Sequence, residues 1–232
     1  MIIRREGDRL LLVRQPDHAA LARQMLEPWQ GPLATSPRRA SILHAIGAHD
    51  DGWLEVDQAP VVDEARGDLL DFVAVPLAVR HAVWPRAVGG LAEDPWAAAL
   101  VAQHAITVFE RFRGDPDWVA FFEDLERRRA AQVAAADGHQ DVLEADYVYL
   151  RTADLLSLAF CHAWPEPQAY GPYTIQLEGE RLWISPDPLA GREVLLSVTA
   201  RVLPARPYTA QEARDAFIRA PRVTLAGVLA GR

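Results

Sequence analysis

Hydrophobic residues recur at helical spacing through the middle of the chain and alternate with polar residues near its two ends. Between residues 16 and 164, apolar side chains three and four positions apart predict a series of amphipathic helices. Residues 1–14, 173–185 and 194–203 alternate as strands do, with turn-forming residues between them. We therefore expect a mainly α fold within a single domain of 232 residues.

The two kinds of segment predict how that domain is organised. The helices of residues 16–164 would form the core, a helical bundle. The N-terminal hairpin and the strands of residues 170–232 would join in a small β-sheet beside it, which makes the fold α+β overall.

Local signals mark where several helices begin. Pro16, Ser36-Pro37, Asp94-Pro95 and Asp115-Pro116 each place a proline at the first helical position, three of them after a capping side chain. Thr209 with Glu212 forms the pattern of a capping box for a helix near the C-terminus.

Two segments are expected to be less regular. Residues 52–71 are rich in turn-forming and acidic residues and predict a long loop, and residues 221–232 predict a short strand or tail.

The doublet His49-Asp50 lies at the end of one predicted helix. His49 continues the apolar stripe of Ile42, Ala45 and Ile46, so its imidazole points toward the core. An unpaired buried charge is costly, and a divalent metal is a partner that accepts an imidazole nitrogen and a carboxylate oxygen together. The alternative is that these residues simply form the exit turn of the helix.

Other His and Asp side chains, which are able to bind a metal, also fall on apolar helical stripes. Each one, taken alone, is also explained as a hydrogen-bonded core residue. One metal centre explains all of them together, and we predict such a centre. Its ligands would be His18, His49, Asp50, His81, His104 and Asp154.

Composition narrows the classes of function. The net charge of −8 argues against a general nucleic-acid surface or an anionic-membrane surface. All 24 basic residues are Arg, so any clamp for a phosphate or carboxylate must use guanidinium groups. The single cysteine, Cys161, excludes an internal disulfide and fits a reducing cytoplasm. With no signal peptide or long apolar span, we expect a cytoplasmic protein that does not bind membranes.

The order of these residues resembles the HD-domain superfamily. Its signature is a His, then a His-Asp doublet on the next helix, then a distant Asp within a late helix, matched here by His18, His49-Asp50 and Asp154. The segments Gln15–His18 and Ala48–Trp53 look like a bacterial family of uncharacterised members within that superfamily. The resemblance covers roughly residues 16–164 and implies a helical metal-binding bundle.

The intervening His81 and His104 resemble the binuclear branch of the superfamily, which includes cyclic-nucleotide and cyclic-di-GMP phosphodiesterases and diiron oxygenases. Two departures argue against cyclic-di-GMP. Trp53 stands near the place of that branch's Lys, and its Gly-Tyr-Pro signature is missing, since Tyr170-Gly171-Pro172 has another order and place.

Three functions remain open. The first is a metal-dependent phosphohydrolase with one or two ions of Fe, Mn, Ni or Zn. In its two-ion form Asp50 would bridge the ions, with His18, His49 and Asp154 on one and His81 and His104 on the other, and Asp51 would orient a water. In the phosphohydrolase, Arg80 and Arg86 would hold the phosphate of a small-molecule substrate. Trp53 and His162 are further substrate-side candidates. The second is an HD-type diiron oxygenase, and the third is a non-catalytic metal-binding or interaction module. A homo-oligomer is compatible with all three.

Overall fold

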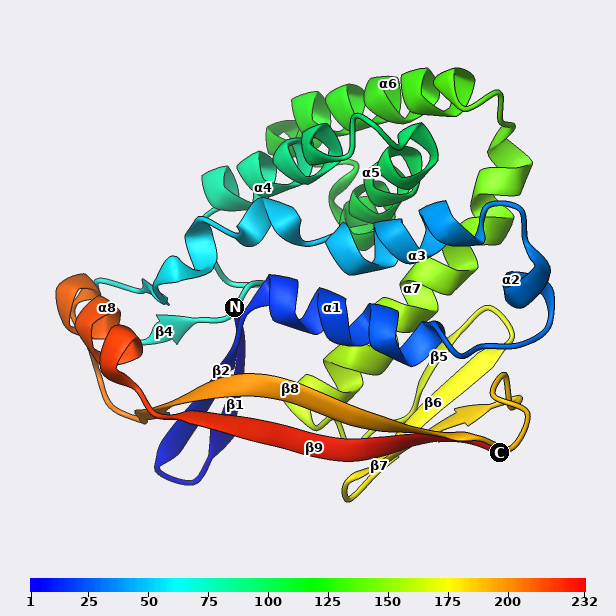
Figure 1. Ribbon diagram of the computed structural model, residues 1–232. Coiled ribbons are helices and arrows are strands. Elements are labelled where there is room, and N and C mark those ends of the chain that lie inside the picture. The colour runs from blue at the N-terminus through cyan, green and yellow to red at the C-terminus, as the bar shows by residue number, and fades with distance from the viewer.

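The computed structural model describes residues 1–232 and shows an α+β fold (Figure 1). About 50% of the residues are helical and 22% are in strands. A curled seven-stranded sheet lies along one side of the molecule, and most of the helices pack over one face of this sheet (Figure 1).

The large sheet has the order β1-β2-β8-β9-β7-β6-β5. All neighbouring strands are antiparallel except β7 and β9, which are parallel. The N-terminal and C-terminal parts of the chain therefore meet where β2 pairs with β8. The strands are β1 (Ile2–Glu6), β2 (Arg9–Val13), β5 (Gln168–Tyr170), β6 (Tyr173–Glu178), β7 (Arg181–Ser185), β8 (Glu193–Pro204) and β9 (Arg222–Gly231).

The prediction of a mainly α fold with a small sheet is wrong. Both predicted hairpins and the strand at residues 194–203 are present, but two strands exceed expectation. β8 has 12 residues, and β9, expected as a short strand or tail, has 10 and lies between β8 and β7. β9 is rich in small residues, and its exposed end shows no clear hydrophobic alternation. Its sequence therefore does not predict a strand in the middle of the sheet.

Four helices enclose the interior in which five of the six predicted metal ligands lie. The helices α3 and α7 contact each other, and each of them also contacts α1 and α5. The helices are α1 (Gln15–Leu26), α2 (Pro32–Thr35), α3 (Arg39–Ala48), α4 (Leu77–Gly90), α5 (Pro95–Phe109), α6 (Val119–Ala135), α7 (Gln140–His162) and α8 (Ala210–Arg219).

The predicted start signals hold for most helices. Pro16 and Pro95 lie in the first turn of α1 and α5, Asp94 caps α5, and the capping box at Thr209 is present. The prediction is wrong for Ser36-Pro37, because α3 begins later, at Arg39. The predicted long loop after residue 52 contains two 3-10 turns, η1 (Asp51–Trp53) and η2 (Val56–Gln58), and a short hairpin of β3 (Val61–Val62) and β4 (Leu69–Leu70).

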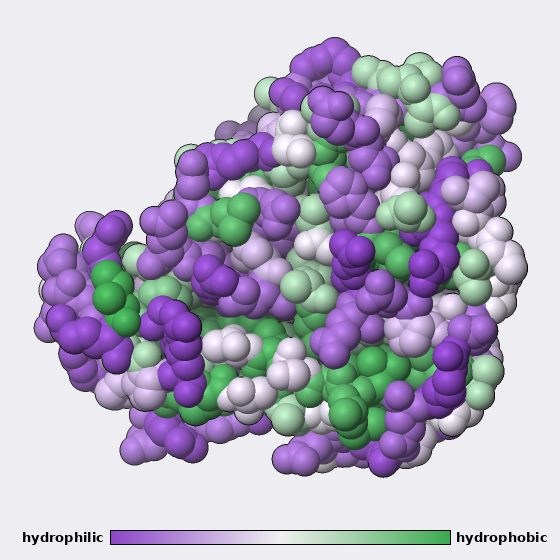
Figure 2. Space-filling view, in the orientation of Figure 1, coloured by the Kyte–Doolittle hydropathy of each residue, from purple (hydrophilic) through white to green (hydrophobic).

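Helices and sheet share one hydrophobic core. A cluster of 54 buried residues includes Leu100 on α5, Leu150 on α7 and Leu229 on β9. On the face shown in Figure 2, the part of the surface formed by the helices is mostly hydrophilic, and hydrophobic residues gather lower down, toward the sheet. No helix is both long enough and apolar enough to cross a membrane.

Candidate metal centre

Five of the six predicted ligands come together in the interior of the four helices. His18 comes from α1, His49 and Asp50 follow the last turn of α3, His104 comes from α5 and Asp154 from α7. None of the five is more than 4% exposed. At this depth a polar group has no water as a hydrogen-bond partner, so these side chains must satisfy one another's hydrogen bonds and charges.

The five side chains form a continuous series of contacts. His18 Nε2 lies 2.7 Å from Asp50 Oδ2, and His49 Nε2 lies 3.5 Å from the same oxygen. His49 Nε2 is also 3.6 Å from Asp154 Oδ1, and His104 Nε2 is 3.8 Å from Asp154 Oδ2. All three imidazoles thus turn their Nε2 atoms toward the two carboxylates.

The outward Nδ1 atom of each imidazole has its own partner. His49 Nδ1 donates to the carbonyl of Ile46 at 2.7 Å. His18 Nδ1 lies 2.8 Å from Ser157 Oγ, whose own proton goes to the carbonyl of Asp154. His104 Nδ1 lies 3.1 Å from the hydroxyl of Tyr147. Metal-binding histidines are held in the same way, with one ring nitrogen hydrogen-bonded and the other left for the ion.

The hydrogen bonds at Nδ1 leave the Nε2 atoms of His49 and His18 with lone pairs that face the carboxylates. Since Ile46 O and Ser157 Oγ can only accept there, the Nδ1 atoms of His49 and His18 must carry protons, and their neutral rings present an unprotonated Nε2. His49 Nε2 has no hydrogen-bond partner although it is buried. Acceptors facing carboxylate oxygens require a proton or a cation between them.

The electrostatics of the metal-free cluster show the same need for positive charge. Burial lowers the pKa of His49, but Asp50 and Asp154 outweigh it and raise the pKa to about 9. Burial opposes ionisation of Asp154, yet its contacts with His49, His104 and Arg151 lower the pKa of its carboxyl. His104 lacks comparable compensation, and burial lowers its pKa to about 3.

A small cation fits these donors. Ligand atoms of His18, His49 and Asp154 all lie within 4.8 Å of one another, a separation that a central ion bonded at about 2.0–2.2 Å would bridge with slight inward movement. Asp50 contacts two of the three. With neutral imidazoles, the two carboxylates outnumber the single guanidinium of Arg151, which donates to Asp154 at 2.5 Å, and the remaining negative charge can be offset by a proton on His49 or by a divalent ion.

A cavity of about 300 Å³ opens onto this cluster, and His18, Asp50, His104 and Asp154 form part of its wall. Several aromatic side chains also form the wall, among them Trp84, Phe109 and the substrate-side candidate Trp53. Three guanidinium side chains also line it: Arg80, Arg111 and Arg151.

The other predicted site residues lie elsewhere. The ring of His81 packs against Trp118 and Phe121, with centroids 4.6 and 5.0 Å away, and makes no ion pair with the cluster. Arg86 bonds the carbonyl of Gly52 and Glu55.

Two further predicted residues also lie away from the cavity lining. Asp51 is exposed beside the doublet. His162 stacks on Trp164 and faces Asp71. The structure therefore does not bring His81, Arg86, Asp51 or His162 into the wall of the metal cavity.

The comparison with protein families gives one match. Residues 1–205 match the family described as "Protein of unknown function (DUF3891)". The chain belongs to this family. No curated protein and no solved structure matches the chain. The relation of this DUF3891 chain to the HD-domain superfamily therefore stays a prediction.

Sequence reasoning missed two arginines of this DUF3891 site. Arg151 precedes Asp154 by three residues on α7, so the helical repeat places both on one face. Arg111 follows His104 by seven residues and lies in the 3-10 turn η3 (Glu110–Phe112) that ends α5. The same spacing argument that selected His104 and Asp154 would have found both.

Proposed function

We propose that this protein is a metal-dependent hydrolase of phosphate esters, with one divalent ion held by His18, His49, Asp50 and Asp154. The observation that carries the proposal is the buried His49 Nε2, which has no hydrogen-bond partner and faces two carboxylates. Imidazole with carboxylate suits Mn, Fe, Ni or Zn. A bound ion of this kind would acidify a water and neutralise phosphate charge.

The cavity beside the cluster supplies what a phosphate ester needs. Arg80, Arg111 and Arg151 line it, and guanidinium groups bind phosphate oxygens through paired hydrogen bonds. In the reaction, water oxygen bonds to phosphorus, the ester P–O bond breaks, and the alcohol leaves with a proton. The arginines would orient the phosphate and offset the charge that develops on it.

The aromatic wall supports a substrate with an organic group. Trp53 and Trp84 are buried, and Phe109 lies beside them in the lining. Such surfaces exclude bulk water and strengthen the electrostatic contacts inside the cavity. A small phosphorylated molecule with an apolar portion fits this lining better than a bare phosphate.

The placement of His81 favours one ion over two. The two-ion scheme needs His81 and His104 together as ligands of a second ion, but His81 packs among the aromatic rings of Trp118 and Phe121. His104 alone remains next to the cluster. It would act as a further ligand or as a neutral imidazole facing the substrate, because its pKa is lowered to about 3.

Hydrolysis of p-nitrophenyl phosphate and bis(p-nitrophenyl) phosphate tests this function, with the protein loaded in turn with Mn, Fe, Ni and Zn. We expect turnover with at least one ion, and a loss of about 100-fold or more in Asp50→Asn. Arg111→Ala should raise KM more than it lowers kcat, because Arg111 is exposed and its expected contact is with substrate.

The matched control is His44→Gln. His44 is also on α3, but it is exposed and bonds Asp94 instead of the cluster. It should keep full activity. Absence of turnover with every ion on both esters, or equal activity in Asp50→Asn, would contradict the proposal.

A further inference from the structure

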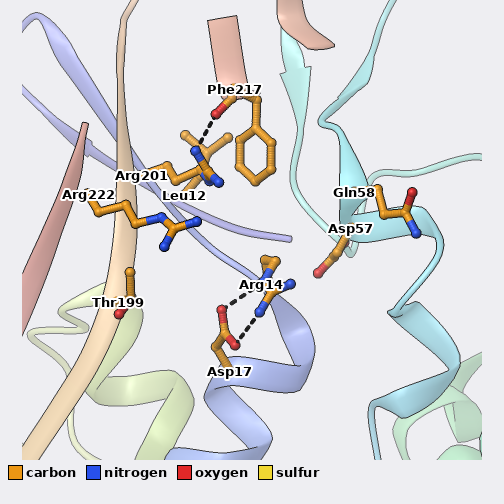
Figure 3. Close-up of a pocket in the computed structure, with 9 residues that line it drawn as sticks. All are labelled: Leu12, Arg14, Asp17, Asp57, Gln58, Thr199, Arg201, Phe217 and Arg222. Carbon is orange, nitrogen blue, oxygen red and sulfur yellow. Dashed lines mark hydrogen bonds and ion pairs between the residues drawn. The ribbon is translucent and has the colours of Figure 1, made fainter. Parts of the chain in front are cut away.

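A second cavity, of about 310 Å³, lies between the sheet, the start of α1 and the end of α8 (Figure 3). Arg201 on β8 and Arg222 on β9 line one side of it, and Arg14, the residue before α1, lines another. It shares no lining residue with the cavity of the metal cluster. Its volume is at the lower end of the range for small-molecule sites.

The two carboxylates in this cavity already have partners. Asp17 accepts two hydrogen bonds from Arg14, at 2.7 and 2.8 Å. Asp57 accepts from the amino group of Met1 at 2.9 Å and from the backbone N–H of Gln15 at 2.6 Å. Neither carboxylate bonds Arg201 or Arg222, so these two guanidinium groups retain uncompensated charge.

Arg201 and Arg222 are directly opposed across the β8–β9 pair. Like charges at opposed positions of an antiparallel pair destabilise it. Burial lowers the pKa of the Arg201 guanidinium, and the charges of Arg222 and Arg14 lower it further. A sheet that retains such a pair gains stability when an anion lies between the two groups.

Arg201 is fixed in position, and Arg222 is free. One nitrogen of Arg201, Nη1, donates to the carbonyls of Phe217 and Ile218 at the end of α8, at 2.7 and 3.1 Å. Its guanidinium lies over the ring of Phe217, 4.7 Å from the centroid, and its Nε and Nη2 atoms make no hydrogen bond within the protein. The side chain of Arg222 is exposed and makes no hydrogen bond or ion pair within the protein. Figure 3 shows its side chain extending into the cavity toward the side that holds Arg14.

We propose that this cavity binds a small soluble molecule carrying phosphate groups. Arg201 would supply donors held in place by α8, Arg222 would close onto the ligand, and the exposed hydroxyl of Thr199 on β8 lies in the same lining. Two unmatched guanidinium groups favour a ligand with at least two negative charges. The proposal does not rest on the proposed hydrolase activity.

Binding here has a route to the metal cluster. The carbonyl of Arg14 accepts from the backbone N–H of His18 at 3.1 Å, and the next residue, Gln15, lines the metal cavity. A ligand that draws Arg14 away from Asp17 would therefore act on the first turn of α1.

Isothermal titration calorimetry with pyrophosphate tests the site, with inorganic phosphate and AMP as further probes. We expect saturable binding of pyrophosphate in the wild-type protein and a loss of at least tenfold in affinity in Arg222→Glu. The Asp50→Asn variant should bind pyrophosphate as the wild type does, which separates this cavity from the metal cluster. Arg214→Glu, at an exposed position of α8 outside the cavity, should also keep wild-type affinity.

Thermal unfolding gives a second readout. Without ligand, Arg222→Glu should raise the unfolding temperature because it replaces repulsion of Arg201 by attraction, while pyrophosphate should no longer raise it further. No binding in the wild type, unchanged affinity in Arg222→Glu, or binding lost in Asp50→Asn would each overturn the proposal. Binding to vesicles with phosphoinositide headgroups but to none of the soluble probes would overturn the assignment to a soluble ligand.

Discussion

The surroundings of the His49 imidazole give the strongest argument for a metal ion in the cluster. Its Nδ1 is fixed by the carbonyl of Ile46, and its Nε2 faces Asp50 and Asp154 at 3.5 and 3.6 Å. These distances are too long for good hydrogen bonds to a protonated ring. An ion bonded to all three groups would satisfy them better, and the proton on His49 is its competitor.

The metal-free protein should therefore show a stability that depends on this proton. The pKa of His49 is raised from an ordinary value of 6.5 to about 9, so its contribution is complete below pH 6.5. That contribution is lost as the pH rises to about 9, at a rate on the order of 1 kcal/mol per pH unit. Urea unfolding of EDTA-treated protein from pH 6 to pH 9.5 measures it.

The His49→Gln variant is the control for that profile, because it has no group that titrates at this position. Its unfolding free energy should change less over the same range of pH. His104 acts with the opposite sign, since its pKa is lowered to about 3 and its effect lies below pH 6.5. A wild-type profile as flat as that of His49→Gln would show that His49 is not protonated between the two carboxylates.

At the residue scale, five of the six candidates that helical spacing selected lie together in the cluster. This spacing selected His18, His104 and Asp154 because each lies on an apolar stripe of its own helix. The same argument failed for His81, since a stripe shows that a side chain is inward and does not show which neighbour it meets. The stripe of α4 at His81 faces Trp118 and Phe121 instead of the centre.

The element that fixes the doublet is the short turn η1 against α4. A Cβ on Gly52 would lie 1.8 Å from the carbonyl oxygen of Val83, so the backbones touch where only glycine fits. Arg86 also donates to the carbonyl of Gly52 at 3.1 Å. This packing holds the segment directly after Asp50.

Gly52→Ala should consequently lower the free energy of unfolding by about 1–3 kcal/mol or more, since the backbone of α4 must move. It should also weaken metal binding, because Asp50 is two residues away. Urea denaturation with metal analysis measures both effects. Gly89→Ala is the matched control: Gly89 is helical, has open space around its Cα, and should give a gain of up to about 1 kcal/mol. Equal stability of the two variants would contradict this role of Gly52.

At the scale of helices and strands, the sequence predicted the presence of an element better than the residues at which it begins and ends. Asp94-Pro95 and the capping box at Thr209 predicted helix starts correctly because each satisfies free N–H groups locally. Ser36-Pro37 carries the same signal, yet Ser36 Oγ accepts from Arg38 N in a turn before α3 begins at Arg39. A capping pattern can thus serve a turn as well as a helix.

At the scale of the whole molecule, the sheet and helices depend on each other through β9. This strand joins β8 to β7, and without it the sheet would divide into two parts. Leu229 on β9 is fully buried in the shared core, whereas Val223 on the same strand is 38% exposed. The family match ends at residue 205, before β9, although the strand is central to the fold.

Leu229→Ala should therefore lower the free energy of unfolding by about 2–5 kcal/mol in a single cooperative transition that includes the helices. Val223→Ala should change it by only about 0.5 kcal/mol. Far-ultraviolet circular dichroism and tryptophan fluorescence, followed together in urea, measure the two variants. Separate transitions for helices and sheet would show that β9 does not couple them.

The sheet was the least predictable feature because its order depends on contacts between distant segments. Hairpins such as β1–β2 are local and follow from alternation and turn residues. The pairing of β2 with β8, and of β7 with β9 in parallel, joins segments far apart in the chain and leaves no local signal. By contrast, the inward placement of His18, His104 and Asp154 could be predicted, because an apolar stripe on one helix shows locally which side chains face the core.

Metal content tests the central claim most directly. Purified protein is loaded with Mn, Fe, Ni or Zn, desalted and analysed by inductively coupled plasma mass spectrometry, beside His49→Gln and the surface control His44→Gln. We predict about one ion per chain in the wild type and in His44→Gln, and almost none in His49→Gln. A wild type that retains no ion, or a His49→Gln variant that retains as much as the wild type, would contradict the account.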